Sequence, residues 1–100
     1  MNSEQPFIVE MSSATLDAFL KQFHQSVRDG CGEQFMSAFA TIQERLKRDP
    51  WEFGESLFIL SPVNVTIFVG MMRPIAVEYG IAIDRRVVFI RRLIYLPPIV

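Results

Sequence analysis

The sequence predicts an α+β domain in which a short N-terminal strand and an α-helical hairpin pack on one face of an antiparallel sheet of three to five strands. Between residues 14 and 48, apolar residues recur every three to four positions, which is the helical period. After Gly54 the period changes to two, which is typical of strands with one buried face. The 100 residues contain no linker-like stretch, so we expect a single domain, 1–100, with an ordered core at about residues 7–96.

The first predicted elements are a strand at residues 7–11 and a helix at residues 14–28. Ser12 or Ser13 can cap the helix, because a side-chain hydroxyl satisfies a free backbone N–H at a helix start. An apolar face runs along this helix, and we expect it to be buried. Its residues are Leu16, Phe19, Leu20, Phe23 and Val27.

A second helix is expected at residues 33–48, where apolar positions again follow the helical spacing. Basic residues in its last turn suit the negative end of the helix dipole. Pro50 prevents the helix from continuing, because proline lacks the backbone N–H that the next turn needs. The short turn with Gly30 and Gly32 makes the two helices antiparallel neighbours.

Four apolar segments after Gly54 predict the remaining strands. The first is the short run at residues 57–60, and alternating segments follow at residues 63–71 and 75–83. The last strand, at residues 86–96, is rich in valine, isoleucine, phenylalanine and tyrosine, which favour sheets.

The hairpin between the last two strands brings opposite charges together. With a two-residue turn at residues 84–85, Glu78 lies opposite Arg91, and with a three-residue loop it lies opposite Arg92. A structural ion pair of this kind contributes roughly 0.2–1 kcal/mol. The alternative is that these three side chains line a polar site on the sheet. Since neighbouring residues of a strand point to opposite faces, we expect only one of the two arginines on the open face.

Composition narrows the class of protein. Half of the residues are hydrophobic, 21% are charged and the net charge is −1, which excludes a disordered tail or a histone-like arm. One cysteine excludes a disulfide framework and a cysteine-based zinc cluster. The start of the chain lacks the features of a secretory signal, and the longest uncharged stretch, residues 56–72, is too short and too polar to span a bilayer. We therefore expect a cytoplasmic protein with no metal, no cofactor and no membrane contact.

The charge is distributed unevenly. Residues 1–60 carry five basic and nine acidic side chains, whereas residues 61–100 carry five basic and two acidic ones. A basic C-terminal part suits a polyanion or an acidic partner, or it reflects ordinary exposed strand positions. The mean hydropathy of +0.25 is high for a small domain, so we expect some apolar surface to remain exposed as a partner site.

The order and spacing of these elements resemble the RelE/ParE toxin superfamily of bacterial toxin–antitoxin systems over about residues 7–96. The second helix ends in LKRDP at residues 46–50, followed by Gly54 and Leu57, which is similar to a passage of that family. The segment VGMMR at residues 69–73 looks like its strand and arginine turn. Residues 77–79 and 87–92 look like its last two strands.

The resemblance implies a toxin that is neutralised by an antitoxin wrapped around it, with ribosome-bound mRNA or DNA gyrase as the target. If the chain is an enzyme, the implied activity is endoribonuclease-type phosphodiester cleavage. In the nuclease members, basic residues and a tyrosine hold and polarise the scissile phosphate. The residues carried over are Lys47 and Arg48 for phosphate binding, and Arg73, Arg91, Arg92 and Tyr95 for catalysis.

A second function stays open, that of a non-catalytic protein-interaction module with the same fold. The net charge of −1, the apolar segment after Arg92 and the proline directly after Arg73 all depart from the pattern of the nucleases. Convergence of Lys47, Arg48, Arg73 and one of the arginines at 91–92 in one positive concavity would favour cleavage. Dispersal of these residues, or their neutralisation by Glu78, would favour the interaction module.

Overall fold

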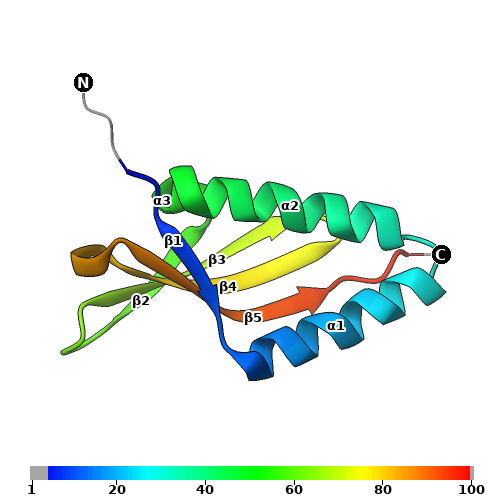
Figure 1. The fold of residues 1–100 in the computed structure, drawn as a ribbon, viewed down its shortest axis with the longest axis horizontal. Coiled ribbons are helices and arrows are strands. Elements are labelled where there is room, and N and C mark those ends of the chain that lie inside the picture. The colour runs from blue at the N-terminus through cyan, green and yellow to red at the C-terminus, as the bar shows by residue number, and fades with distance from the viewer. Residues whose placement is uncertain (1–4, 100) are drawn as a thin grey trace.

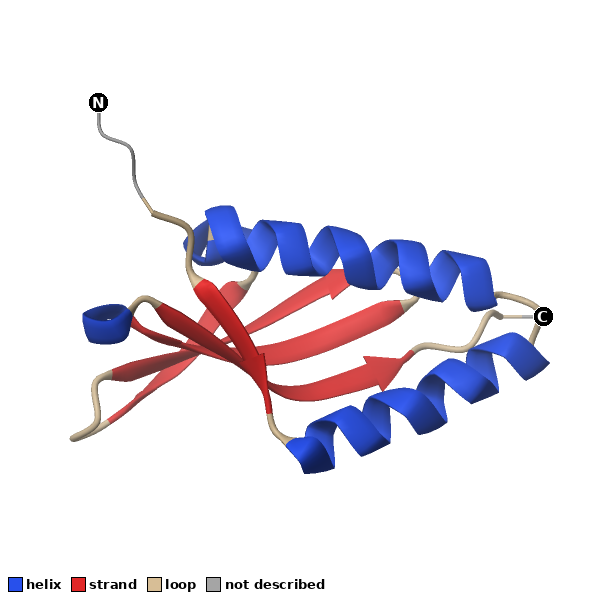
Figure 2. Cartoon of the chain, in the orientation of Figure 1, coloured by secondary structure: helices blue, strands red, loops and turns tan. Residues whose placement is uncertain are grey.

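The computed structural model describes residues 5–99; residues 1–4 and 100 of the expected single domain lie outside this range. In chain order the elements are β1 (Ile8–Met11), α1 (Ser13–Arg28), α2 (Gly32–Arg48), α3 (Pro50–Phe53), β2 (Glu55–Leu60), β3 (Val65–Met72), β4 (Ile75–Ala82), a 3-10 turn (Ile83–Arg85) and β5 (Val87–Tyr95). The strands form one sheet in the order β1-β5-β4-β3-β2 (Figure 1). The predicted α+β fold, with a helical hairpin packed against a sheet, is confirmed (Figure 2).

The sheet is mixed rather than purely antiparallel. β2, β3, β4 and β5 are antiparallel neighbours, whereas β1 runs parallel to β5, with Ile8 beside Val87 and Met11 beside Ile90. A tight hairpin forces its two strands to be antiparallel. No hairpin joins β1 to β5, so the direction of β1 depends on how the helical hairpin crosses the sheet.

The helices and one face of the sheet enclose the main core. Val77, Tyr79 and Ile81 of β4 are almost completely buried there, together with Phe35 and Ile42 of α2. Figure 1 shows α1 and α2 meeting at their connecting turn and splaying apart toward the other end. The opposite face of the sheet carries no helix, and we call it the open face.

Only part of the predicted apolar face of α1 is buried. Phe19 is 6% exposed, whereas Leu16, Leu20 and Val27 are 44–52% exposed. α1 lies along β5 at the margin of the sheet, so only one side of the helix reaches the core. The prediction that the whole stripe is buried is therefore wrong for these three residues.

A one-turn helix that the sequence pattern does not predict, α3, follows α2 directly. Pro50 occupies its first turn, where the fixed φ of proline is favourable. The hydroxyl of Tyr79 donates a hydrogen bond to the carbonyl oxygen of Pro50 at 2.6 Å. At Gly54 a Cβ atom would lie 2.5 Å from the carbonyl oxygen of Val69. These contacts hold the corner from which β2 starts.

Within residues 5–99 we find no helix with the length and apolar character needed to cross a membrane.

Candidate functional site

A β-bulge in β5 places both arginines opposite one glutamate. Near the turn, Ala82 pairs with Val87 and Tyr79 with Ile90, but Glu78 pairs with Arg92, so Arg91 is the extra residue of the bulge. The Nη1 atom of Arg91 lies 3.2 Å from Glu78 Oε2, and Nη1 of Arg92 lies 4.0 Å from Oε1. The prediction that the two arginines point to opposite faces is therefore wrong, because the bulge interrupts the alternation.

The turn of this hairpin also differs from the predicted two- or three-residue loop. A 3-10 turn at Ile83–Arg85 is followed by Arg86 in the left-handed conformation, with φ of 51°. The guanidinium carbon of Arg86 lies 4.2 Å from the centre of the Phe7 ring, and the group donates hydrogen bonds to the Gln5 carbonyl oxygen. Arg86 therefore ties the N-terminal segment to this turn.

The charged cluster lies in an apolar setting on the open face. The Glu78 side chain is 20% exposed, against 40% for Arg91 and 66% for Arg92. Val69 stands directly opposite Glu78 on β3, and exposed apolar side chains continue along β3 and β5. With one carboxylate and two guanidinium groups, the cluster carries one surplus positive charge. We define the open-face patch as Glu78, Arg91, Arg92, Val69, Met71 and Ile94.

Lys47 and Arg48 lie elsewhere, in the last turn of α2. Both side chains are exposed, and Nε of Arg48 lies 3.9 Å from Oε1 of Glu44. Their position beside α3 is at the end of α2 remote from the α1–α2 turn (Figure 1). They suit the negative end of the helix dipole there.

Arg73 lies apart from them, in the turn between β3 and β4. It shares a hollow with residues from the first half of α2, among them Glu33, Gln34 and Ser37. This hollow also reaches Thr41, which at a rise of 1.5 Å per residue lies about 9 Å along the helix axis from Lys47. Arg73 and Lys47 therefore lie beside different turns of α2.

Tyr95 belongs to the buried face of the sheet and not to the open face. It is 7% exposed, and its hydroxyl lies 2.7 Å from a carboxylate oxygen of Asp29 and 2.9 Å from Sγ of Cys31. Burial, together with the hydrogen bonds to Cys31 and Asp29, raises the pKa of Tyr95 above its usual value. Tyr95 therefore keeps its proton and ties the end of β5 to the α1–α2 turn.

Gln22 closes the edge of β5 beyond the end of β1. Its carboxamide donates to the carbonyl oxygen of Leu93 and accepts from the N–H of Tyr95. One side chain thus replaces a neighbouring strand over these two residues, and no sequence motif signals this contact.

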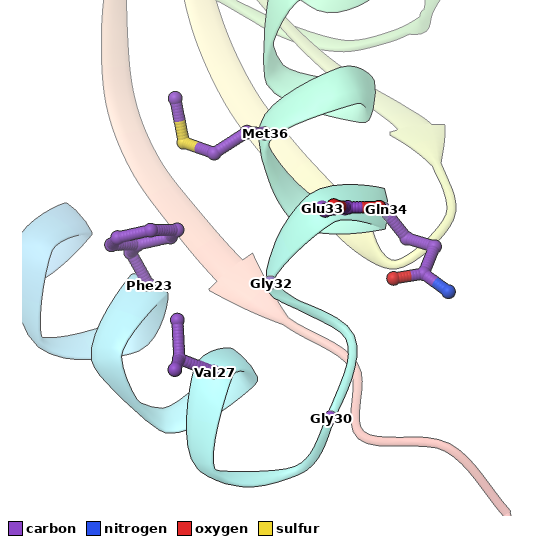
Figure 3. A pocket seen from close by; sticks show the side chains of 7 residues that line it. All are labelled: Phe23, Val27, Gly30, Gly32, Glu33, Gln34 and Met36. Atoms are coloured by element: carbon purple, nitrogen blue, oxygen red, sulfur yellow. The ribbon is translucent and has the colours of Figure 1, made fainter.

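A hollow with a volume of about 500 Å³ lies between the two helices near their connecting turn. The side chains of Phe23, Val27 and Met36 line the space between the helices, whereas Gln34 extends away from it (Figure 3). Glu33 is the one charged residue among those that line this hollow, so the hollow lacks the several convergent polar groups of a catalytic pocket. Within residues 5–99 no three histidine, cysteine or carboxylate side chains are grouped to hold a metal ion.

The sequence-predicted site residues thus fall in separate places. The structure brings Glu78, Arg91 and Arg92 together, but it separates them from Lys47 and Arg48, from Arg73 and from Tyr95. Comparison of the chain with protein-family models, with curated proteins and with solved structures gives no match.

Proposed function

We propose that this chain is a non-catalytic protein-binding module with a RelE/ParE-like fold, and that its open-face patch binds an antitoxin-like protein. The family assignment rests on the order of strands and helices and on the motifs quoted above. The assignment of binding rather than cleavage rests on the distribution of the basic side chains.

The dispersal of the basic residues is the observation that carries this proposal. Cleavage of a phosphodiester needs several donors aimed at one phosphate, where they stabilise the charge of the transition state. Lys47 lies in the last turn of α2, Arg73 lies beside the first half of that helix, and Tyr95 lies on the buried face of the sheet. Arg91, the more buried of the two adjacent arginines, is paired with Glu78. This arrangement supports protein binding over cleavage of ribosome-bound mRNA.

The patch indicates what its partner should look like. Glu78 holds Arg91 at 3.2 Å, but its contact with Arg92 is longer, at 4.0 Å, and the Arg92 side chain is two-thirds exposed. The Arg92 guanidinium can therefore turn to a carboxylate of the partner. Val69, Met71 and Ile94 supply apolar contacts beside it. The best complement is a segment with one aspartate or glutamate among apolar residues.

A library of short displayed peptides, selected on the purified chain, tests this proposal. We expect the enriched peptides to combine an acidic residue with apolar ones. Arg92→Glu should weaken their binding in titration calorimetry by about tenfold or more, because a charged hydrogen bond is lost. Arg85→Glu is the matched control, since it makes the same charge change in the 3-10 turn away from the patch.

Three results would overturn the proposal. The first is equal loss of binding in Arg92→Glu and Arg85→Glu, and the second is enrichment of peptides without acidic residues. The third is growth arrest on induced expression in bacteria that Arg73→Ala or Arg91→Ala relieves, since this would indicate a catalytic toxin.

A further inference from the structure

β2 is an edge strand with a bulge at Leu57, where its register with β3 shifts between Ser56 and Phe58. The sheet order ends at β2, and among residues 5–99 no strand pairs with its outer edge. All six of its residues are exposed, and the run from Leu57 to Leu60 is entirely apolar. Proteins usually protect such edges with charges, prolines or covering segments, because free N–H and C=O groups recruit another strand.

The other edge of the sheet is different. β1 has only four residues and carries Glu10 near its middle. A charge within an edge strand disfavours pairing with another strand. In β2 the only charged residue, Glu55, lies at the first position of the strand.

Strand addition at β2 would bury apolar side chains on both faces of the sheet. Phe58 and Leu60 lie beside Ile67 and Val65, which form a second apolar cluster with Ala82 and Phe89 on the open face. Ile59 is opposite Thr66, so it projects to the other face, where it is 64% exposed. An added strand therefore finds apolar contacts above and below the backbone.

We propose that β2 is a self-association edge and that it pairs antiparallel with β2 of a second copy, giving one continuous sheet through both chains. A two-fold axis through the middle of β2 makes the pairing antiparallel and uses the same surface on both copies. It places Glu55 opposite Leu60, which lies on the same face of the sheet, and not opposite the second Glu55. A parallel pairing in register would set the two glutamates side by side, which is destabilising. The edge is thus complementary to itself.

The exposed area sets the expected strength of this dimer. Leu57, Phe58, Ile59 and Leu60 are 55%, 47%, 64% and 37% exposed. Together they offer roughly 400 Å² per copy, about half of the area per partner in a standard stable interface. We therefore expect a reversible dimer with a dissociation constant in the micromolar range.

Sedimentation equilibrium from a few micromolar to several hundred micromolar chain tests the proposal, combined with hydrogen exchange at both ends of this range. We expect the mass to double with concentration and the amides of β2 to become more protected, while those of β1 do not change. Ile59→Lys should raise the dissociation constant at least about tenfold, because it places a charge on the edge. Ile8→Lys is the matched control, since Ile8 is 60% exposed on the opposite edge strand.

A chain that stays monomeric at every concentration would overturn the proposal, and so would a dimer that Ile8→Lys disrupts while Ile59→Lys does not. If Ile59→Lys fails to fold, hydrogen exchange on the unmodified chain still tests the proposal, since β2 amides that gain no protection at high concentration would contradict it. The proposed binding at the open-face patch is tested separately, because Arg92→Glu should leave the dimer unchanged.

Discussion

Replacing Tyr79 by phenylalanine removes one hydroxyl from the corner where α3 meets the sheet. Tyr79 is completely buried, and its hydroxyl donates to the Pro50 carbonyl oxygen at 2.6 Å. The ring remains packed between Phe68 and Phe53, whose centroids lie 5.4 and 6.1 Å away. The buried carbonyl loses this donor, which costs about 1–3 kcal/mol of the free energy of unfolding. For a domain of this size, each kcal/mol lowers Tm by about 4–8 °C.

The same substitution changes how stability depends on pH. Burial raises the pKa of Tyr79 from 10.0 to about 12. The unfolded chain therefore loses this proton at a lower pH than the folded protein does. The stabilisation is fully present below about pH 10 and is lost as the pH rises toward 12, with a loss of about 1.4 kcal/mol at pH 11. Tyr79→Phe lacks this loss, so the stability difference between the two proteins should shrink above about pH 10.

Urea unfolding at several pH values measures both effects. Circular dichroism reports the helices, and the fluorescence of Trp51 reports the corner itself, because its ring centroid lies 5.6 Å from that of Phe68. A difference below about 0.5 kcal/mol at neutral pH would refute the hydrogen-bond argument. If the stability difference between the two proteins exceeds about 0.5 kcal/mol but stays constant up to about pH 11, the raised pKa of Tyr79 is refuted.

Two further substitutions test other contacts. Gln22→Ala should destabilise the fold by about 1–2 kcal/mol and speed hydrogen exchange at the Tyr95 amide, because that amide loses its acceptor. Gln25→Ala is the control and should leave the exchange rate of this amide unchanged. Equal exchange rates in the two variants would contradict the hydrogen bond between Gln22 and β5. Gly54→Ala sets a Cβ atom 2.5 Å from the Val69 carbonyl oxygen, so we expect a loss of more than about 2 kcal/mol in chemical unfolding. An unchanged midpoint would mean that this corner can move to accept the methyl group.

The two proposed contact surfaces are compatible with each other. The charged groups of the open-face patch lie on β4 and β5, and its Val69 lies on β3 beside Glu55 of β2, whereas self-association uses the outer edge of β2. A dimer through β2 leaves Arg91 and Arg92 exposed, and a segment bound at the patch leaves the backbone of β2 free. Partner binding and self-association can therefore occur in the same molecule.

The helices show what periodicity can and cannot predict. Both predicted helices agree with α1 and α2 to within about one residue at each end. The predicted burial of Leu16, Leu20 and Val27 is wrong, because periodicity identifies an apolar side without saying whether a neighbour covers it. α3 was not predicted, because its four residues are too few to show a repeat.

The candidate site, like the helices, could be predicted only in part from the sequence. The hairpin pattern brings Glu78 close to the arginine pair without any tertiary information. The extra residue in β5 has no sequence signature, so the common side of Arg91 and Arg92 could not be predicted. The separation of Lys47 from Arg73 depends on which end of α2 the β3–β4 turn approaches, which spacing along the chain does not report.

The spacing of apolar residues along the chain is a local property, and it was sufficient to predict the fold class, the two long helices and the three long strands. The pairing of β1 with β5, the bulge and the exposed edge of β2 depend on contacts between segments far apart in sequence. Those contacts form because they give the lowest free energy among the alternative packings. Many residues contribute to this free energy, so no single segment of the sequence indicates it. The charged cluster, the buried Tyr95 and the open edge of β2 are therefore properties of the folded chain.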